Sequence, residues 1–252
     1  MTEDLELTKK RFIELAGKAE RGLYYTFTDF LGLAEQAALA EIEGKIRAVK
    51  RTQFGGIEGA ERFMVRFGDE EELGYDQPFP IRYIKVAPVS QKFAEKLSHR
   101  DILGSLMGLG IERDKLGDII LKNNEAYLVA HEDIAPYITR ELIKVRRTDV
   151  RCEIVGSMPS DVGYSTEQRS IQIAGERLDA VIAKVYNLSR EEAQMLFRRG
   201  LVYVGGRECS SLSYTPRQGD KITVRGYGRF IYLGFSSLSR KGKINANILV
   251  YV

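Results

Sequence analysis

The chain has 252 residues, of which 44% are hydrophobic and 29% are charged, and its formal net charge is +3. This composition is typical of a soluble globular protein of two or three domains. The chain contains no run of about 18 apolar residues, which argues against a membrane span, and its polar start at residues 1–10 lacks the apolar core of a signal peptide. Its two cysteines, Cys152 and Cys209, and two histidines, His99 and His131, have neither disulfide-framework nor metal-site spacing. We therefore expect a cytoplasmic protein with no membrane partner, no metal and no cofactor.

Residues 1–75 predict a small α/β domain. Apolar side chains between residues 12 and 16 have the spacing of an amphipathic helix, and residues 34–42 predict a second helix. Strands are expected at residues 46–54 and 61–67, with a glycine-rich connection between them. The acidic and proline-containing segment 68–80 predicts a linker.

Residues 80–158 predict a ferredoxin-like domain of α+β class. The expected order of elements is strand 81–87, helix 100–109, strands 117–121 and 126–130, helix 132–142 and strand 145–155. This βαββαβ order occurs in many RNA-recognition modules and also in many unrelated proteins. The aromatic central-strand signature of the RNA-recognition motif is missing, so RNA contact by this domain stays open. A second boundary is expected at residues 156–163, where Gly, Ser, Pro and Asp accumulate.

Residues 170–252 predict two helices followed by a small sheet. Leu178, Val181, Ile182 and Val185 form the apolar stripe of the first helix. Ser189 and Glu192 have the spacing of a capping box that begins the second helix. Gly200 suits the end of this second helix. Strands are expected at residues 201–204 and 221–224, and Gly205 with Gly206 is expected to form a tight turn after the first strand.

Positive charge is concentrated in this last part of the chain. Residues 171–252 contain 13 Lys or Arg and 6 Asp or Glu, a balance of +7, whereas residues 1–170 contain 25 and 29, a balance of −4. A local field of this sign attracts phosphate even when the net charge of the chain is small.

The ordered motifs of this region resemble the S-four RNA-binding domain, named after a ribosomal protein of the small subunit. The motifs are Arg177-Leu178-Asp179, then residues 189–194, 199–206 and 219–226. The chain departs from the family at Gly205, where asparagine is usual. The resemblance implies an RNA face lined by Arg177, Ser189, Arg190, Gln194, Arg199 and Arg207, with Arg225 and Arg229 flanking it. Helical spacing adds Lys184, which shares an edge with Arg177, and Arg198, which continues the stripe of Arg190 and Gln194.

Three further segments resemble the YlmH family of bacterial proteins. They are residues 27–31, residues 54–56 with 60–62, and residues 99–104 through 110–119. The resemblance covers nearly the full length. It implies a non-enzymatic, monomeric cytoplasmic protein that binds structured ribosomal RNA of the large subunit near peptidyl-tRNA, in the handling of stalled translation, with tRNA as a further candidate partner. The genes of this family lie near cell-division genes.

An RNA-modifying enzyme, of pseudouridine synthase or methyltransferase type, is the alternative. Arg177-Leu178-Asp179 also opens a pseudouridine synthase motif, but the residues that follow continue an apolar helix, so Asp179 is interpreted as a helix-start acid or an arginine partner. His99-Arg100-Asp101 lacks the asparagine of a kinase loop, since Leu106 stands there, and Ser98 is expected to cap a helix. No other nucleophile with a base is visible, so no catalytic residue is predicted.

Overall fold

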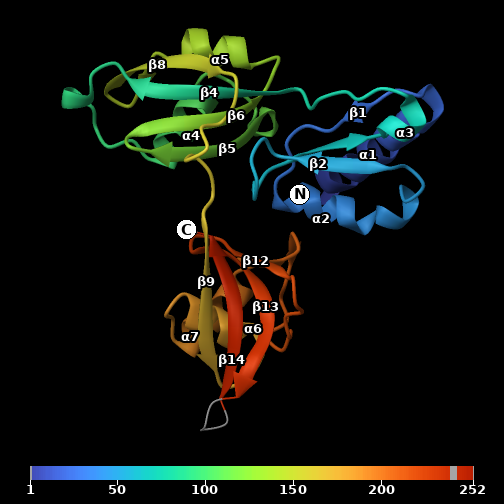
Figure 1. Cartoon of the computed structure of the whole chain (residues 1–252), viewed down its shortest axis with the longest axis vertical. Helices are drawn as coiled ribbons and strands as arrows, with labels where there is room; N and C mark the ends of the chain where they lie inside the picture. Colours follow the sequence, from blue (N-terminus) through green and yellow to red (C-terminus); the bar gives the residue numbers. More distant parts are fainter. Residues whose placement is uncertain (1, 239–242, 252) are drawn as a thin grey trace. The chain divides into compact units, whose positions relative to one another are not determined.

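A computed structural model describes residues 2–238 and 243–251. The chain forms two compact units, one up to Gly163 and one from Tyr164 onward. Both mix helices with antiparallel sheets, as the ribbon in Figure 1 shows. The predicted α+β class is confirmed. None of the described helices is long and apolar enough to cross a membrane.

The first unit begins with helices packed on a three-stranded antiparallel sheet of order β1-β3-β2. Its elements are α1 Thr2–Gly22, β1 Thr26–Phe27, α2 Leu33–Glu41, the 3-10 turn η1 Glu43–Lys45, β2 Arg51–Phe54, β3 Met64–Phe67 and α3 Glu70–Leu73. The strand expected at residues 46–54 is therefore wrong in its first half. Ile46 and Val49 are both buried, so their spacing reflects a turn that packs on the core. The segment 68–80 also holds a helical turn, α3, begun by the side chain of Asp69, which accepts from the Glu72 N–H at 2.9 Å.

The first unit continues with a five-stranded antiparallel sheet of order β5-β6-β4-β8-β7. Its elements are β4 Ile81–Pro88, the 3-10 turn η2 Gln91–Phe93, α4 His99–Gly108, the 3-10 turn η3 Arg113–Lys115, β5 Leu116–Lys122, β6 Glu125–His131, α5 Ala135–Glu141, β7 Lys144–Val145 and β8 Thr148–Val155. Without β7, the order is that of the predicted ferredoxin-like βαββαβ unit. The Ser98–Asp101 capping box begins α4 as expected. The last predicted strand is a hairpin instead, because Arg146 turns the chain with φ 53° between β7 and β8.

The two parts of the first unit share a buried joint. Phe30 and Met64 pack with Ile81 and Val129 in one apolar cluster. The guanidinium of Arg62 donates to the backbone oxygens of Leu116, Phe30 and Arg113 at 2.9, 2.6 and 3.1 Å. These hydrogen bonds satisfy donors of the Arg62 guanidinium, a group whose pKa is lowered by burial.

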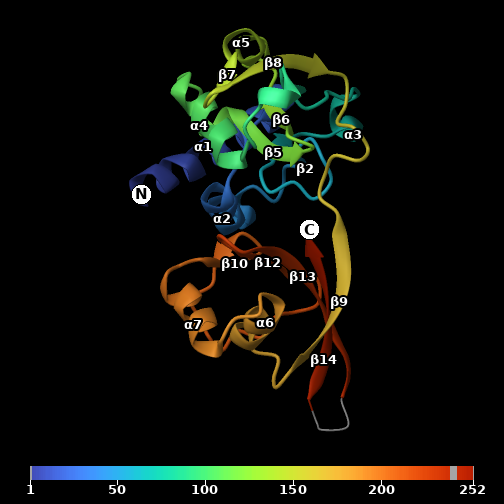
Figure 2. The ribbon, with the colours of Figure 1, turned by 90° about the vertical axis from the view of Figure 1, so that its left-hand side faces the viewer.

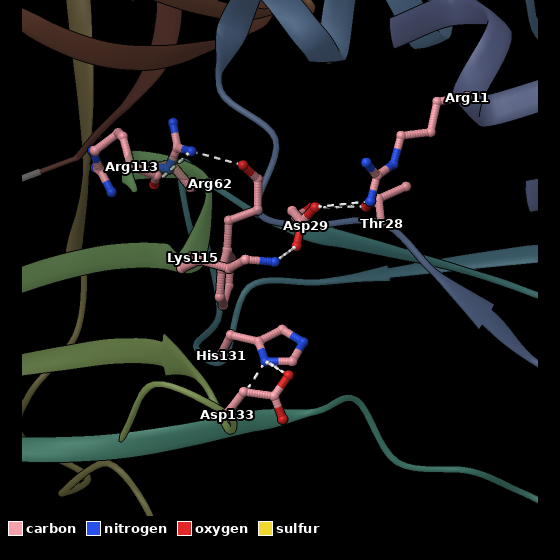
Figure 3. Close-up of polar contacts among 9 residues, drawn as sticks. Arg11, Thr28, Asp29, Arg62, Arg113, Lys115, His131 and Asp133 are labelled. Carbon is pink, nitrogen blue, oxygen red and sulfur yellow. Dashed lines mark hydrogen bonds and ion pairs between the residues drawn. The ribbon is translucent and has the colours of Figure 1, made fainter. Parts of the chain in front are cut away.

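Two carboxylates complete this joint. Buried Asp118, in β5, accepts the backbone N–H of Glu61 at 2.6 Å and that of Arg62 at 3.1 Å. Asp29 binds both Lys115 and Arg11, as Figure 3 shows together with the nearby Arg62. The contacts connect residues predicted as separate domains, and residues up to Gly163 form one compact unit.

Replacing Asp118 tests this joint. Asp118→Ala leaves two amide groups of Glu61 and Arg62 without their acceptor, so we expect the free energy of unfolding of the first unit to fall by about 2 kcal/mol. Denaturant titration of the full chain measures it. The control is Asp149→Ala, since that carboxylate is exposed and pairs with the exposed Lys144 at 3.4 Å. Equal stability of the two variants would show that the joint is not held by Asp118.

The second unit is a six-stranded antiparallel sheet of order β11-β10-β12-β13-β14-β9, with two helices. Its elements are β9 Thr166–Ile173, α6 Leu178–Val185, α7 Arg190–Arg198, β10 Val202–Val204, β11 Arg207–Glu208, β12 Lys221–Val224, β13 Gly228–Leu238 and β14 Ile244–Tyr251. Figure 2 shows α6 and α7 on the same side of this sheet. They cover one face, where Leu178, Ile182, Phe197 and Phe230 are buried in a common core.

The local predictions for this unit are confirmed at its helices and its first turn. Gly200 follows α7 with φ 63°, and Gly205 and Gly206 both have positive φ in the two-residue turn between β10 and β11. The predicted sheet was too small, because it lacked β9, β13 and β14. These three strands carry most of the sheet's pairing, with β14 between the other two.

Candidate nucleic-acid interface

A capping box fixes the start of α7. The Ser189 hydroxyl accepts from the backbone N–H of Glu192 at 3.2 Å, and the Glu192 carboxylate accepts from the backbone N–H of Ser189 at 2.7 Å. These bonds hold the pKa of Glu192 below its ordinary value. Two of the orphan N–H groups at the helix start are thereby satisfied, so the residues that follow on α7 have a fixed direction.

The carboxylate of Asp179 lies at the centre of the predicted RNA face. It is fully buried at the start of α6. Arg177 donates to both of its oxygens, from Nε to Oδ1 at 3.1 Å and from Nη2 to Oδ2 at 2.9 Å. Gln194 on α7 donates to Oδ2 at 3.3 Å, and Nε of Arg190 lies 3.6 Å from the same oxygen. One carboxylate therefore gathers three of the predicted site residues.

The charge state of Asp179 follows from these contacts. Burial alone raises the pKa of a carboxyl group, but the hydrogen bonds from Arg177 and Gln194 and the positive charges of Arg177 and Arg190 outweigh it. The pKa of Asp179 thus lies below its ordinary value, and the group is ionised at neutral pH.

The ion pairs do not remove the arginines from solvent. The side chain of Arg177 remains 44% exposed and that of Arg190 58% exposed. A guanidinium has five N–H donors in a fixed fork, so each arginine can bind Asp179 on one edge and a phosphate on another. The arrangement orients the two cations without neutralising their outer edges.

The remaining predicted residues of this region lie on the same helices and the hairpin that follows. Lys184 is in the last turn of α6, Arg198 in the last turn of α7 and Arg199 directly after it, and Arg207 begins β11; all four are exposed. We call the following set the helical surface: Arg177, Lys184, Ser189, Arg190, Gln194, Arg198, Arg199 and Arg207.

Arg229, which was expected to flank the helical surface, lies on the other face of the sheet. Arg229 lies between Phe230, which is in the core, and Gly228, so strand alternation turns its side chain to the face away from α6 and α7. There its guanidinium stacks at 4.0 Å from the ring centroids of both Tyr164 and Tyr251. The guanidinium of Arg225 lies 4.6 Å from the ring centroid of Tyr203. A linear motif gives the order of residues but not the sheet face, which is why the sequence did not place Arg229 correctly.

Candidate metal ligands, the two thiols and the aspartate of the pseudouridine synthase-like motif bear on the enzyme alternative. Across residues 2–238 and 243–251, no three His, Cys, Asp or Glu side chains are grouped so that they could hold a metal ion. Burial raises the pKa of the Cys152 thiol to about 12 and also raises that of Cys209, so both are protonated at neutral pH. Asp179, the aspartate of the pseudouridine synthase-like motif, is fully buried among its donors.

Comparisons with known proteins agree that this chain is of an RNA-binding class. Residues 176–222 match the model of the S4 domain, so the chain carries an RNA-binding domain of the S-four type. Residues 76–157 match a second model, described as "Putative RNA-binding domain in YlmH".

One named protein aligns with most of the chain. "Ribosome-associated protein quality control protein P2" of Bacillus subtilis (strain 168) is 30% identical over 222 residues, which is 86% of this chain and 83% of that protein. The chain belongs to the YlmH family. Among solved structures, "Cell division protein ylmH from Streptococcus pneumoniae" aligns with a TM-score of 0.47 at 22% identity, over 62% of this chain and 92% of that one.

The role of Asp179 is testable by an isosteric change. Asp179→Asn removes the charge that pairs with Arg177 and Arg190, and we expect it to lower the free energy of unfolding of the second unit by about 1–3 kcal/mol at pH 7. Because the pKa of Asp179 is depressed in the folded state, its contribution is present above the unfolded pKa and is lost as pH falls through the folded one. The difference between variant and parent should therefore shrink below about pH 4. A constant difference from neutral pH to about pH 2 in denaturant titrations would contradict this role.

Proposed function

We propose that this protein is a non-enzymatic, cytoplasmic RNA-binding protein of ribosome-associated quality control. It docks as a monomer on structured ribosomal RNA of the large subunit, near peptidyl-tRNA, and assists in the handling of stalled translation. The matched S4 model and the name of the Bacillus subtilis relative support this proposal. Transfer RNA is a second candidate partner, and in-cell crosslinking that compares ribosomal with transfer RNA reads would distinguish the two.

The single observation that carries the proposal is the helical surface organised on Asp179. It contains six cationic side chains, and the two that contact Asp179, Arg177 and Arg190, are held in place before any ligand arrives. A-form RNA hides its base edges in a deep, narrow groove, so a protein recognises it mainly by phosphate spacing and 2′-hydroxyl groups. Rigid guanidinium groups on a helix pair suit that mode of recognition.

The enzyme alternative has a direct test. An RNA-modifying enzyme predicts a modified nucleotide in ribosomal RNA that disappears when the gene is deleted, whereas a binding factor predicts an unchanged modification pattern. Mass mapping of ribosomal RNA from deleted and parent strains measures this. The buried position of Asp179 and the raised pKa values of both thiols favour the binding factor.

The proposed docking surface is tested by a double substitution. We expect Arg190→Ala with Arg199→Ala to abolish co-sedimentation of the full chain with large ribosomal subunits, because it removes two exposed cations from the helical surface. The matched control is Arg21→Ala with Arg47→Ala, which removes two exposed arginines from the first unit outside residues 76–157. Undiminished co-sedimentation of a folded Arg190/Arg199 variant would count against the proposal.

The salt dependence of binding counts the phosphate contacts. If all six cations of the helical surface meet phosphates, the slope of log affinity against log salt should be about −4 to −5, at about 0.7 to 0.9 per contact. The Arg190/Arg199 variant should give about −3. Filter binding to a structured fragment of ribosomal RNA at several salt concentrations measures both slopes. A slope near zero for the parent chain would exclude phosphate as the main ligand.

A further inference from the structure

The turn between β12 and β13 carries an exposed aromatic ring that is not part of the helical surface. Tyr227 lies in this turn and is 47% exposed. Its neighbours Gly226 and Gly228 have φ of 85° and 130°, values that residues with a side chain rarely adopt. The ring is therefore presented at the tip of the turn, with no side chain on the residue before or after it.

Two further rings support Tyr227 from the inside. Its ring centroid lies 5.5 Å from that of Tyr186, and the Tyr186 centroid lies 6.1 Å from that of Phe230. Phe230 is fully buried in the core that α6 and α7 cover, and Tyr186 packs against the same core. A continuous aromatic contact thus runs from the core to the surface. The outer ring is held by rigid neighbours while much of it stays accessible.

The turn lies beside both helices of the helical surface. Tyr186 directly follows α6 and is two residues after Lys184. On the other side, the backbone N–H of Arg225 donates to the carbonyl oxygen of Leu201 at 2.9 Å, and Leu201 is two residues after Arg199. The exposed ring therefore lies between the end of α6 and the end of α7, and each of these ends carries an exposed cation of the helical surface.

We propose that Tyr227 stacks on an unpaired base of the RNA that the helical surface binds. Bases inside a duplex are covered by their neighbours, whereas a bulged or looped-out base exposes a flat face that stacks on aromatic side chains. The cations at the two helix ends can bind the phosphates on either side of such a base. The ligand class is therefore duplex RNA interrupted by an unpaired nucleotide.

This inference rests on the proposed function and narrows it. The helical surface alone suits any A-form backbone, because phosphate contacts carry no sequence information. A stacking ring beside it distinguishes an interrupted duplex from a continuous one. Tyr227 is thus assigned as a residue that determines specificity, and the arginines as residues that supply affinity.

The test compares two RNA duplexes that differ by a single bulged nucleotide, the fluorescent base 2-aminopurine. The emission of this base falls when it stacks, and the chain contains no tryptophan that would obscure it. We expect the full chain to bind the bulged duplex about tenfold more tightly than the continuous one. Binding should also quench the emission of the bulged base.

Variants at one position separate stacking from packing. Tyr227→Ala should abolish both the preference for the bulged duplex and the quenching, while its affinity for the continuous duplex equals that of the parent chain. Tyr227→Phe keeps the ring and should retain both effects. The matched control is Tyr75→Ala, which removes a 43% exposed tyrosine of the first unit whose ring lies 5.3 Å from that of Tyr25. A residue that only packs would change the unfolding transition but not the discrimination between the two RNAs.

The outcomes separate this inference from the proposed function. Equal affinity of the unmodified chain for the two duplexes, a result that depends on no variant, overturns the inference and leaves RNA binding by the helical surface intact. An equal loss of preference in Tyr75→Ala also overturns the inference. If neither duplex binds, the proposed function fails and the inference fails with it. If Tyr227→Ala binds both RNAs as the parent does but co-sediments less with ribosomal subunits, the ring contacts ribosomal protein and the RNA assignment is overturned.

Discussion

The helical surface depends on one buried charge, the Asp179 carboxylate. An ionised group in an apolar core is costly unless its oxygens are hydrogen-bonded. Here Arg177, Gln194 and the backbone N–H of Ala180 supply those bonds, from the residue before α6, from α7 and from α6 itself. The same contacts that make the charge tolerable therefore fix the two helices to each other and hold the arginine side chains in place. Part of their rotamer entropy is lost when the protein folds, so less remains to be lost on binding.

The first unit is held together differently. Its two parts meet through Arg62 and Asp118, whose side chains bind backbone groups. Backbone partners cannot rotate away, so these bonds define the relative position of the two sheets more closely than exposed pairs such as Lys18 with Glu14. The apolar cluster of Phe30, Met64 and Val129 lies beside them. If the ferredoxin-like part binds a ligand, it does so as one compact unit with α1 and α2.

The sequence predicted those helices and turns that are stabilised by interactions between residues close together in the chain. The apolar spacing of α6, the Ser189–Glu192 cap and the glycine turn at Gly205 all depend on residues within a few positions of one another, and all three are confirmed. The strands β9 and β14 depend on each other across about 80 residues of chain, and most of β9 is polar and exposed, so no local hydrophobic pattern marks it. The first half of the strand predicted at residues 46–54 is wrong for the converse reason. Its apolar residues serve a turn that only tertiary packing explains.

Strand alternation also explains why the site could be predicted only in part. Arg229 and Phe230 are adjacent in sequence, yet one stacks between two tyrosines and the other lies in the core under the helices. A sheet that packs helices on one side always leaves its other side chains for a separate role, and here those side chains are aromatic, amide and cationic.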